Sequence, residues 1–90
     1  MDKHFIYILQ SRLDNKYYIG QTSDLIERMD AHERGSVNAT KYRRPLDLVY
    51  FKSVDSRREA LVLERKIKDY KDTERYLQNI GLVMAPSSNG

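Results

Sequence analysis

Two blocks of strand-forming residues lie close together near the start of the sequence, and their spacing limits the possible folds more than any other feature. Residues 4–10, HFIYILQ, are a run of β-branched, aromatic and aliphatic side chains, which is typical of a strand covered on both faces. A second block, residues 16–20, follows after the polar stretch 11–15. So short a connection predicts an antiparallel hairpin with a loop of about four residues.

The hairpin carries two of the seven tyrosines of the chain, Tyr7 and Tyr18. If Gln10 pairs with Asn15, the antiparallel register places Tyr7 directly opposite Tyr18. The sequence therefore predicts two phenol groups side by side on one sheet.

The stretch after the hairpin has the start and stop signals of a helix. Residues 22–24 offer N-cap oxygens and an early acidic group, and Gly35 is the matching C-terminal stop. Arg28 lies on the flank of a stripe that repeats between these ends at helical spacing and consists of Leu25, Met29 and His32. From Gly35 to Pro45 the chain is rich in small, polar and basic residues, which predicts a long basic loop.

The second half of the chain predicts a third strand and two helices. Residues 46–54 have the composition of a strand, and Ser56 with Glu59 matches a capping box that opens a helix through about Asp69. The inward stripe of this helix should consist of Ala60, Leu63, Ile67 and Tyr70. A shorter helix over residues 73–79 should pack through Tyr76, Leu77 and Ile80.

These elements define an α+β fold: a small three-stranded antiparallel sheet flanked by helices, in the order β-β-α-β-α-α. A chain of 90 residues holds one modest core, so we expect a single domain over residues 1–80. The small and polar end of the chain, residues 81–90, is expected to be a flexible tail.

The composition excludes several kinds of chemistry. With 40% hydrophobic and 32% charged residues, the chain has the composition of a soluble globular protein. The absence of cysteine excludes disulfides, zinc-thiolate sites and thiol nucleophiles. No apolar run is long enough to span a membrane, so the cytoplasm is the expected location. The net charge of +3 permits binding to a polyanion.

Two short segments of the hairpin resemble the half-motifs that name the GIY-YIG nucleases. They are Phe5-Ile6-Tyr7, in which phenylalanine stands where the family has glycine, and Tyr18-Ile19-Gly20, which is complete. Three further positions match the family in the same order along the chain: Arg28, His32 and Glu64. The resemblance covers roughly residues 3 to 70.

Within the family, the chain looks most like the small stand-alone bacterial proteins, the UPF0213-like group, and less like the N-terminal catalytic domain of the incision protein of the ABC excinuclease. The resemblance implies a metal-dependent DNA endonuclease that hydrolyses a phosphodiester in DNA repair or recombination. DNA and other repair proteins are the implied partners, and a monomer or weak dimer is expected. An alternative stays open, in which the fold serves as a nucleic-acid-binding module without turnover.

The resemblance also assigns catalytic roles. It implies that Tyr7 is the general base or water-orienting group and that Tyr18 is its partner. Arg28 matches a helix arginine whose guanidinium contacts a phosphate, and His32 can orient the phosphate or share a proton relay. Each of these residues also has a purely structural interpretation. The two tyrosines could be half-buried strand aromatics, Arg28 a solvated helix residue, and His32 a cap of the helix C-terminus.

Glu64 interrupts the apolar stripe of the second predicted helix, where a buried carboxylate is costly unless it is paired or coordinated. It either forms a salt bridge with Arg28 or, as the resemblance implies, holds one divalent ion, Mg²⁺ or Mn²⁺. Glu64 and Lys66 also form a Glu-x-Lys pair of the restriction-enzyme type, although that motif belongs on a strand.

The basic loop is a candidate DNA contact through Lys41, Arg43 and Arg44, and a solvated charged face is the equal alternative. Gln21 stands where related nucleases often carry a lysine directly after the second half-motif. The charge of that lysine is therefore missing from this chain.

Overall fold

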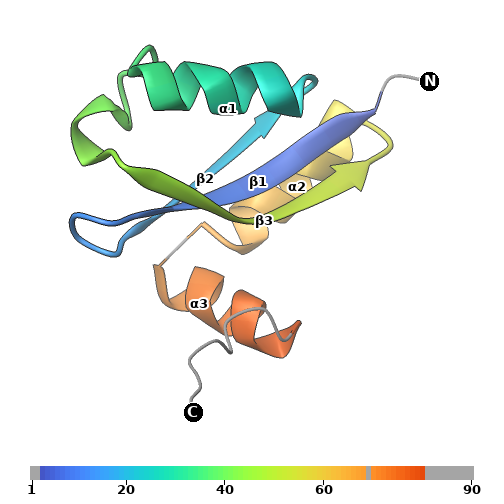
Figure 1. Cartoon of the computed structure of the whole chain (residues 1–90). Coiled ribbons are helices and arrows are strands. Elements are labelled where there is room, and N and C mark those ends of the chain that lie inside the picture. The colour runs from blue at the N-terminus through green and yellow to red at the C-terminus, as the bar shows by residue number, and fades with distance from the viewer. Residues whose placement is uncertain (1–2, 69, 81–90) are drawn as a thin grey trace.

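The computed structural model describes residues 3–68 and 70–80. Along the chain these residues form β1 (His4–Ser11), β2 (Tyr17–Thr22), α1 (Leu25–Arg34), the 3-10 helix η1 (Lys41–Arg43), β3 (Leu46–Val54), α2 (Arg57–Lys66) and α3 (Tyr70–Asn79) (Figure 1). The predicted order β-β-α-β-α-α is confirmed, and η1 is an addition within the predicted basic loop. The expected tail, residues 81–90, lies outside the described residues.

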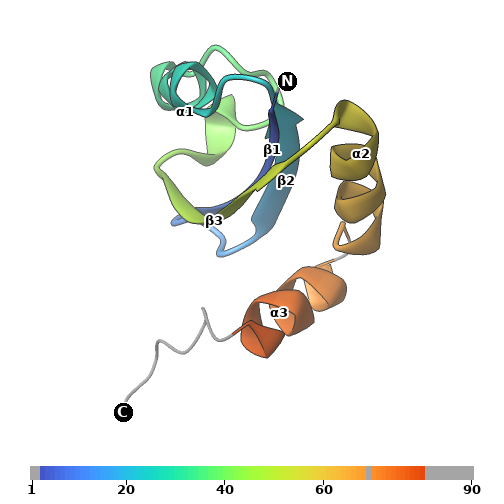
Figure 2. The same ribbon diagram turned by 90° about the vertical axis from the view of Figure 1, so that its right-hand side faces the viewer.

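The three strands form one antiparallel sheet in the order β2-β1-β3, so β1 is the central strand. Figure 2 shows α1 on one side of this sheet and α2 on the other, with α3 below α2. The predicted α+β architecture is therefore confirmed. No helix of the described segments is both long and apolar enough to cross a bilayer.

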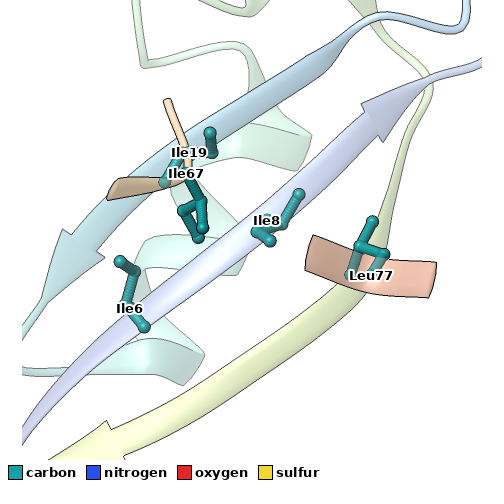
Figure 3. Packing of buried hydrophobic residues seen from close by; sticks show 5 residues of the cluster. All are labelled: Ile6, Ile8, Ile19, Ile67 and Leu77. Carbon is teal, nitrogen blue, oxygen red and sulfur yellow. The ribbon is translucent and has the colours of Figure 1, made fainter. Parts of the chain in front are cut away.

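The hydrophobic core lies between the sheet and the helices α2 and α3 (Figure 3). Its buried members are Ile6, Ile8, Ile19, Ile67 and Leu77. Because successive strand residues point to opposite faces, the even-numbered isoleucines of β1 enter this core, while the residues between them face α1. Tyr7 is one of those, and it is also completely buried.

The hairpin register differs from the prediction by two residues. Tyr7 pairs with Gly20, and Tyr18 pairs with Leu9. The loop keeps the predicted length of about four residues but lies one residue further along the chain, because β1 continues to Ser11, whose backbone N–H donates to the carbonyl of Lys16 at 3.0 Å. A shift of two keeps the same faces, so the two tyrosines still lie on the α1 side, as diagonal rather than direct neighbours.

The helix caps form at the predicted positions. The Asp24 side chain accepts from the Glu27 backbone N–H at 3.1 Å, and Gly35 ends α1 in the left-handed conformation with φ 83°. Ser56 caps α2 by accepting from the backbone N–H of Glu59 at 3.2 Å. The reciprocal bond of the predicted capping box instead runs from the backbone N–H of Asp55 to the Glu59 carboxylate, at 3.3 Å.

The junction between α2 and α3 differs from the prediction. α2 ends at Lys66 rather than near residue 69, and α3 begins at Tyr70 rather than Thr73. The buried hydroxyl of Thr73 donates to the carbonyl of Ile67, which satisfies a group that a continuing helix would have used. The side chain of Tyr70 lies outside the described residues.

α3 packs through two of its three predicted contacts. Leu77 is buried, and the hydroxyl of Tyr76 is 2.9 Å from that of Tyr50 on β3. The prediction was wrong for Ile80, which is 44% exposed.

Candidate active site

Three aromatic rings meet on the α1 side of the sheet. The ring centroid of His32 is 5.5 Å from that of Tyr7 and 5.4 Å from that of Tyr18, and the two tyrosine rings are 6.4 Å apart. Strands β1 and β2 supply the tyrosines and α1 supplies the histidine, so three elements converge here. The tyrosines predicted to lie together do so, through a diagonal contact across the sheet.

Gly20 provides the space in which Tyr7 lies. A Cβ atom added to Gly20 would be 2.4 Å from the hydroxyl oxygen of Tyr7 and 2.6 Å from the ring carbon that carries it. Real Cβ atoms do not approach other atoms so closely, so any side chain at this position would displace the phenol. The glycine of the second half-motif is thus a packing requirement, which sequence reasoning did not identify.

His32 links the buried phenol to a residue that sequence reasoning missed. Its Nε2 is 2.9 Å from the hydroxyl of Tyr7, and its Nδ1 is 2.7 Å from Oγ1 of Thr40, which is completely buried. Thr40 lies among small polar loop residues and carried no signal of its own. Since both ring nitrogens have partners inside the protein, His32 does not cap the C-terminus of α1.

Tyr7 and His32 are both uncharged near neutral pH. Burial, with a smaller effect from the charge of Arg28, lowers the pKa of His32 to about 4. Burial also raises the pKa of the Tyr7 phenol, and this rise is opposed by hydrogen bonding from Arg28 and its charge. A neutral histidine therefore faces a protonated phenol.

The direction of the hydrogen bonds follows from the donor inventory. Arg28 carries only donors, so its interaction with the Tyr7 oxygen, which opposes the rise in the pKa of Tyr7, uses a lone pair and favours an O–H of Tyr7 that donates to Nε2 of His32. Nδ1 then carries the proton of the neutral ring and donates it to Oγ1 of Thr40. Arg28, Tyr7, His32 and Thr40 thus form one ordered chain.

The guanidinium of Arg28 retains donor capacity. Its Nε is buried and has no hydrogen-bond partner among the described residues. A buried donor without a partner is costly, and such groups in native structures mark sites where a ligand or water completes the bonding. A cation in this position suits an incoming phosphate oxygen.

Glu64 lies near the same cluster from the other side of the strand pair. It is half-buried on α2, and its negative charge contributes to the raised pKa of Tyr7. Nε2 of Gln21 donates to Oε1 of Glu64 at 3.1 Å. Within the described part of the chain, the ion pairs do not include Glu64 with Arg28, so the salt-bridge alternative is not formed.

The donor set limits the kind of metal site that is possible. Among residues 3–68 and 70–80, no group of three or more His, Asp or Glu side chains could enclose an ion. Mg²⁺ often takes one or two protein carboxylates and fills its other positions with water and phosphate oxygens. Glu64 alone fits an ion of this kind. The Glu-x-Lys alternative is excluded, because Glu64 and Lys66 lie on a helix.

The candidate DNA-contacting residues lie at η1, and part of their charge has a structural use. Arg44 donates through Nε to the carbonyl of Lys41 at 3.0 Å and through Nη1 to that of Glu33 at 3.1 Å. Lys41 lies over the ring of Tyr42. A cavity of about 480 Å³ adjoins this region, and its lining includes Arg44 and His32. The basic residues and the aromatic cluster therefore adjoin each other at His32.

Two strand tyrosines and a helix arginine thus meet on one face of the sheet. The GIY-YIG catalytic domain matches residues 3–77, and the chain belongs to this nuclease family. It is 41% identical over 71 residues to a UPF0213 protein of Staphylococcus aureus, an alignment that covers 78% of this chain and 85% of the relative. The same values hold for UPF0213 protein SSP2268 of Staphylococcus saprophyticus.

A solved structure supports the same grouping. The solution NMR structure of the UPF0213 protein BH0048 from Bacillus halodurans superposes with a TM-score of 0.58 at 26% sequence identity. The match covers 96% of this chain and 99% of that one. The chain is therefore similar in fold as well as in sequence to the small UPF0213 members of the family.

Proposed function

We propose that this protein is a metal-dependent endonuclease that hydrolyses a phosphodiester of DNA, with Tyr7, Tyr18, Arg28, His32 and Glu64 as its catalytic residues. The observation that carries the proposal is the bond of 2.9 Å between the buried phenol of Tyr7 and the neutral His32, with the buried Nε of Arg28 ready to donate beside it. Membership of a nuclease family supports the reaction type and the DNA substrate. Repair or recombination is the proposed setting, from the likeness to the excinuclease.

Tyr7 and His32 act together on the attacking water. The O–H of Tyr7 points to His32 and Arg28 faces one lone pair, so the remaining lone pair of the buried oxygen would accept a hydrogen bond from a water admitted with the substrate. When the water attacks phosphorus, Tyr7 takes its proton and passes its own proton to Nε2 of His32. Tyr18 is half-buried and packs against both rings, which holds them in position.

Arg28 binds the scissile phosphate and adjusts the proton relay. A phosphate oxygen at the guanidinium completes its bonding and places positive charge where negative charge builds in the transition state. The phosphate also offsets the charge of Arg28, which is one cause of the lowered pKa of His32. Substrate binding therefore makes His32 a better proton acceptor at the time it is needed.

Nucleases of this family generally depend on a divalent metal ion. Glu64 is the proposed ligand of that ion, which would be Mg²⁺ or a similar metal. When bound, the ion would supply stabilisation of the charge on the leaving oxygen. The half-buried carboxylate is held by the bond from Gln21, and its charge acts on Tyr7. Lys41, Arg43 and Arg44 are proposed to contact the DNA backbone beyond the cleavage point.

Cleavage assays with matched variants test the proposal. Purified protein is incubated with branched, nicked, single-stranded and duplex DNA in Mg²⁺ or Mn²⁺, with and without chelator. Cutting should require metal and be lost in Arg28→Ala and Glu64→Ala. Arg34→Ala is the control, because Arg34 is exposed on the same helix and pairs with Asp30. DNA binding without cutting in any condition supports the non-enzymatic module instead.

A further inference from the structure

Gln21 and His4 form a hydrogen-bonded chain that ends on the proposed metal ligand. Nε2 of His4 is 2.9 Å from Oε1 of Gln21, and Nε2 of Gln21 donates to Oε1 of Glu64 at 3.1 Å. The oxygen of an amide only accepts, so the bond from His4 runs from a protonated Nε2 to Gln21. The amide of Gln21 is thus fixed at both ends and cannot turn over without losing both bonds.

The backbone holds this chain in place. Gln21 pairs with Ile6 across the hairpin, and His4 lies two residues before Ile6 on the same face of the sheet. This is the face covered by α2, from which Glu64 reaches back to the strands. All three side chains are half-buried, so solvent competes only partly for their bonds.

We propose that Gln21 and His4 are positioning residues for Glu64, an inference that rests on the proposed metal-dependent function. Gln21 holds Oε1 of the carboxylate and leaves Oε2 for the divalent ion. Its donor is neutral, so the charge of Glu64 is not cancelled before the ion arrives. A lysine at this position would place a cation on the same carboxylate, and it would compete with the metal for it.

The chain makes the carboxylate rigid as well as oriented. A glutamate side chain has three rotatable bonds, and fixing them before the metal binds lowers the entropic cost of binding. His4 contributes by preventing rotation of the amide of Gln21, without touching Glu64 itself. Loss of His4 should therefore weaken metal binding in the same direction as loss of Gln21, and by less.

Metal binding in the absence of DNA separates this role from catalysis. Mn²⁺ affinity is measured by electron paramagnetic resonance for the wild type, Gln21→Met, His4→Phe and Glu64→Ala. Gln21→Met keeps the shape of the side chain, and we expect it to bind Mn²⁺ about tenfold more weakly. Gln10→Met is the matched control, since the side chain of Gln10 donates to the carbonyl of Asn15 in the hairpin, away from Glu64.

Two further measurements separate positioning from packing. His4→Gln restores a donor to Gln21 and should recover most of the affinity lost in His4→Phe. Nitrogen chemical shifts of the imidazole should show that Nε2 of His4 carries a proton in the wild type. Thermal unfolding of each variant verifies that the fold is retained.

The outcomes distinguish this inference from the proposed function. The inference is overturned if Gln21→Met binds Mn²⁺ as the wild type does, or if wild-type Mn²⁺ binding does not depend on Glu64. Mn²⁺ bound at Glu64 and weakened in Gln21→Met, together with no cleavage of any DNA, supports the inference and overturns the proposed function.

Discussion

Tyr7 lies across from Gly20 on the neighbouring strand, and its hydroxyl occupies the volume in which a side chain of Gly20 would begin. This arrangement brings the phenol to His32 while keeping it completely buried. The two half-motifs are therefore a single packing unit, in which one supplies the ring and the other supplies the space.

Gly20→Ala should destabilise the protein and displace Tyr7. The new Cβ would overlap the hydroxyl and its ring carbon, and overpacking of a buried site costs roughly 1–3 kcal/mol. Denaturant unfolding gives this free energy. Tyr7→Phe in the same background should restore only part of it, because the ring carbon stays 2.6 Å from the added Cβ. Full restoration by Tyr7→Phe would contradict this account.

The stability of the fold should decrease as the pH is lowered, because His32 becomes protonated. Its folded pKa of about 4 is below the ordinary value of 6.5, so between these values the unfolded chain binds the proton more tightly. Stabilisation by neutral His32 is present above about pH 6.5 and is lost progressively as the pH falls toward 4, by roughly 2–3 kcal/mol. Denaturant unfolding across this range measures the loss.

Carboxylates also titrate at the lower end of this pH range. The contribution of His32 is therefore obtained by comparing the wild type with a variant that lacks the imidazole. In His32→Gln the slope of stability between about pH 6.5 and 5 should flatten. An unchanged slope would show that another group is responsible.

Removing the charge of Arg28 should raise the pKa of His32. Arg28 is the second cause of the lowered pKa, after burial, so Arg28→Met favours the imidazolium while burial still keeps the pKa below 6.5. The measurement is an NMR titration of the imidazole. Arg34→Met, an exposed change on the same helix, should leave the titration as it is. A fall in the pKa of His32 on losing Arg28 would be inconsistent with the geometry described.

Thr40 should affect cleavage through the tautomer of His32. Thr40→Val removes the acceptor for Nδ1–H of His32. The tautomer with an unprotonated Nε2 facing Tyr7 is then less favoured, and we expect cleavage to slow by about tenfold. Thr40→Ser keeps the hydroxyl and should retain most of the rate. Tyr7→Phe, which removes the proton-transferring group itself, should cost about 100-fold or more in the same assay. Equal rates for Thr40→Val and Thr40→Ser would contradict the role of Thr40.

The sequence was sufficient to predict the elements whose signals are local. Asp24, Gly35 and Ser56 cap their helices where expected, and residues 46–54 form the third strand. These signals depend on bonds between residues close in the chain, so no knowledge of packing is needed to interpret them.

The hairpin register and the partners of the site residues depend on tertiary structure. β1 continues one residue beyond the predicted Gln10, because Ser11 also pairs with Leu46 of β3 and its hydroxyl donates to the carbonyl of Arg43 at 2.8 Å. These contacts come from the other side of β1, so the hairpin sequence alone could not fix the position of the loop. Thr40 was missed for the same reason, since only the fold brings it to His32.

The alternation of β1 has a consequence for how the protein can vary. Its even-numbered residues Ile6 and Ile8 anchor α2 and α3, whereas Tyr7 between them faces the candidate active site. Substitutions of Ile6 or Ile8 should therefore act mainly on the melting temperature. Substitutions of Tyr7 should act mainly on the cleavage rate. Deletion or insertion of a single residue within β1 would move every following side chain to the opposite face of the sheet. The length of β1 should therefore tolerate change less well than the identity of its residues.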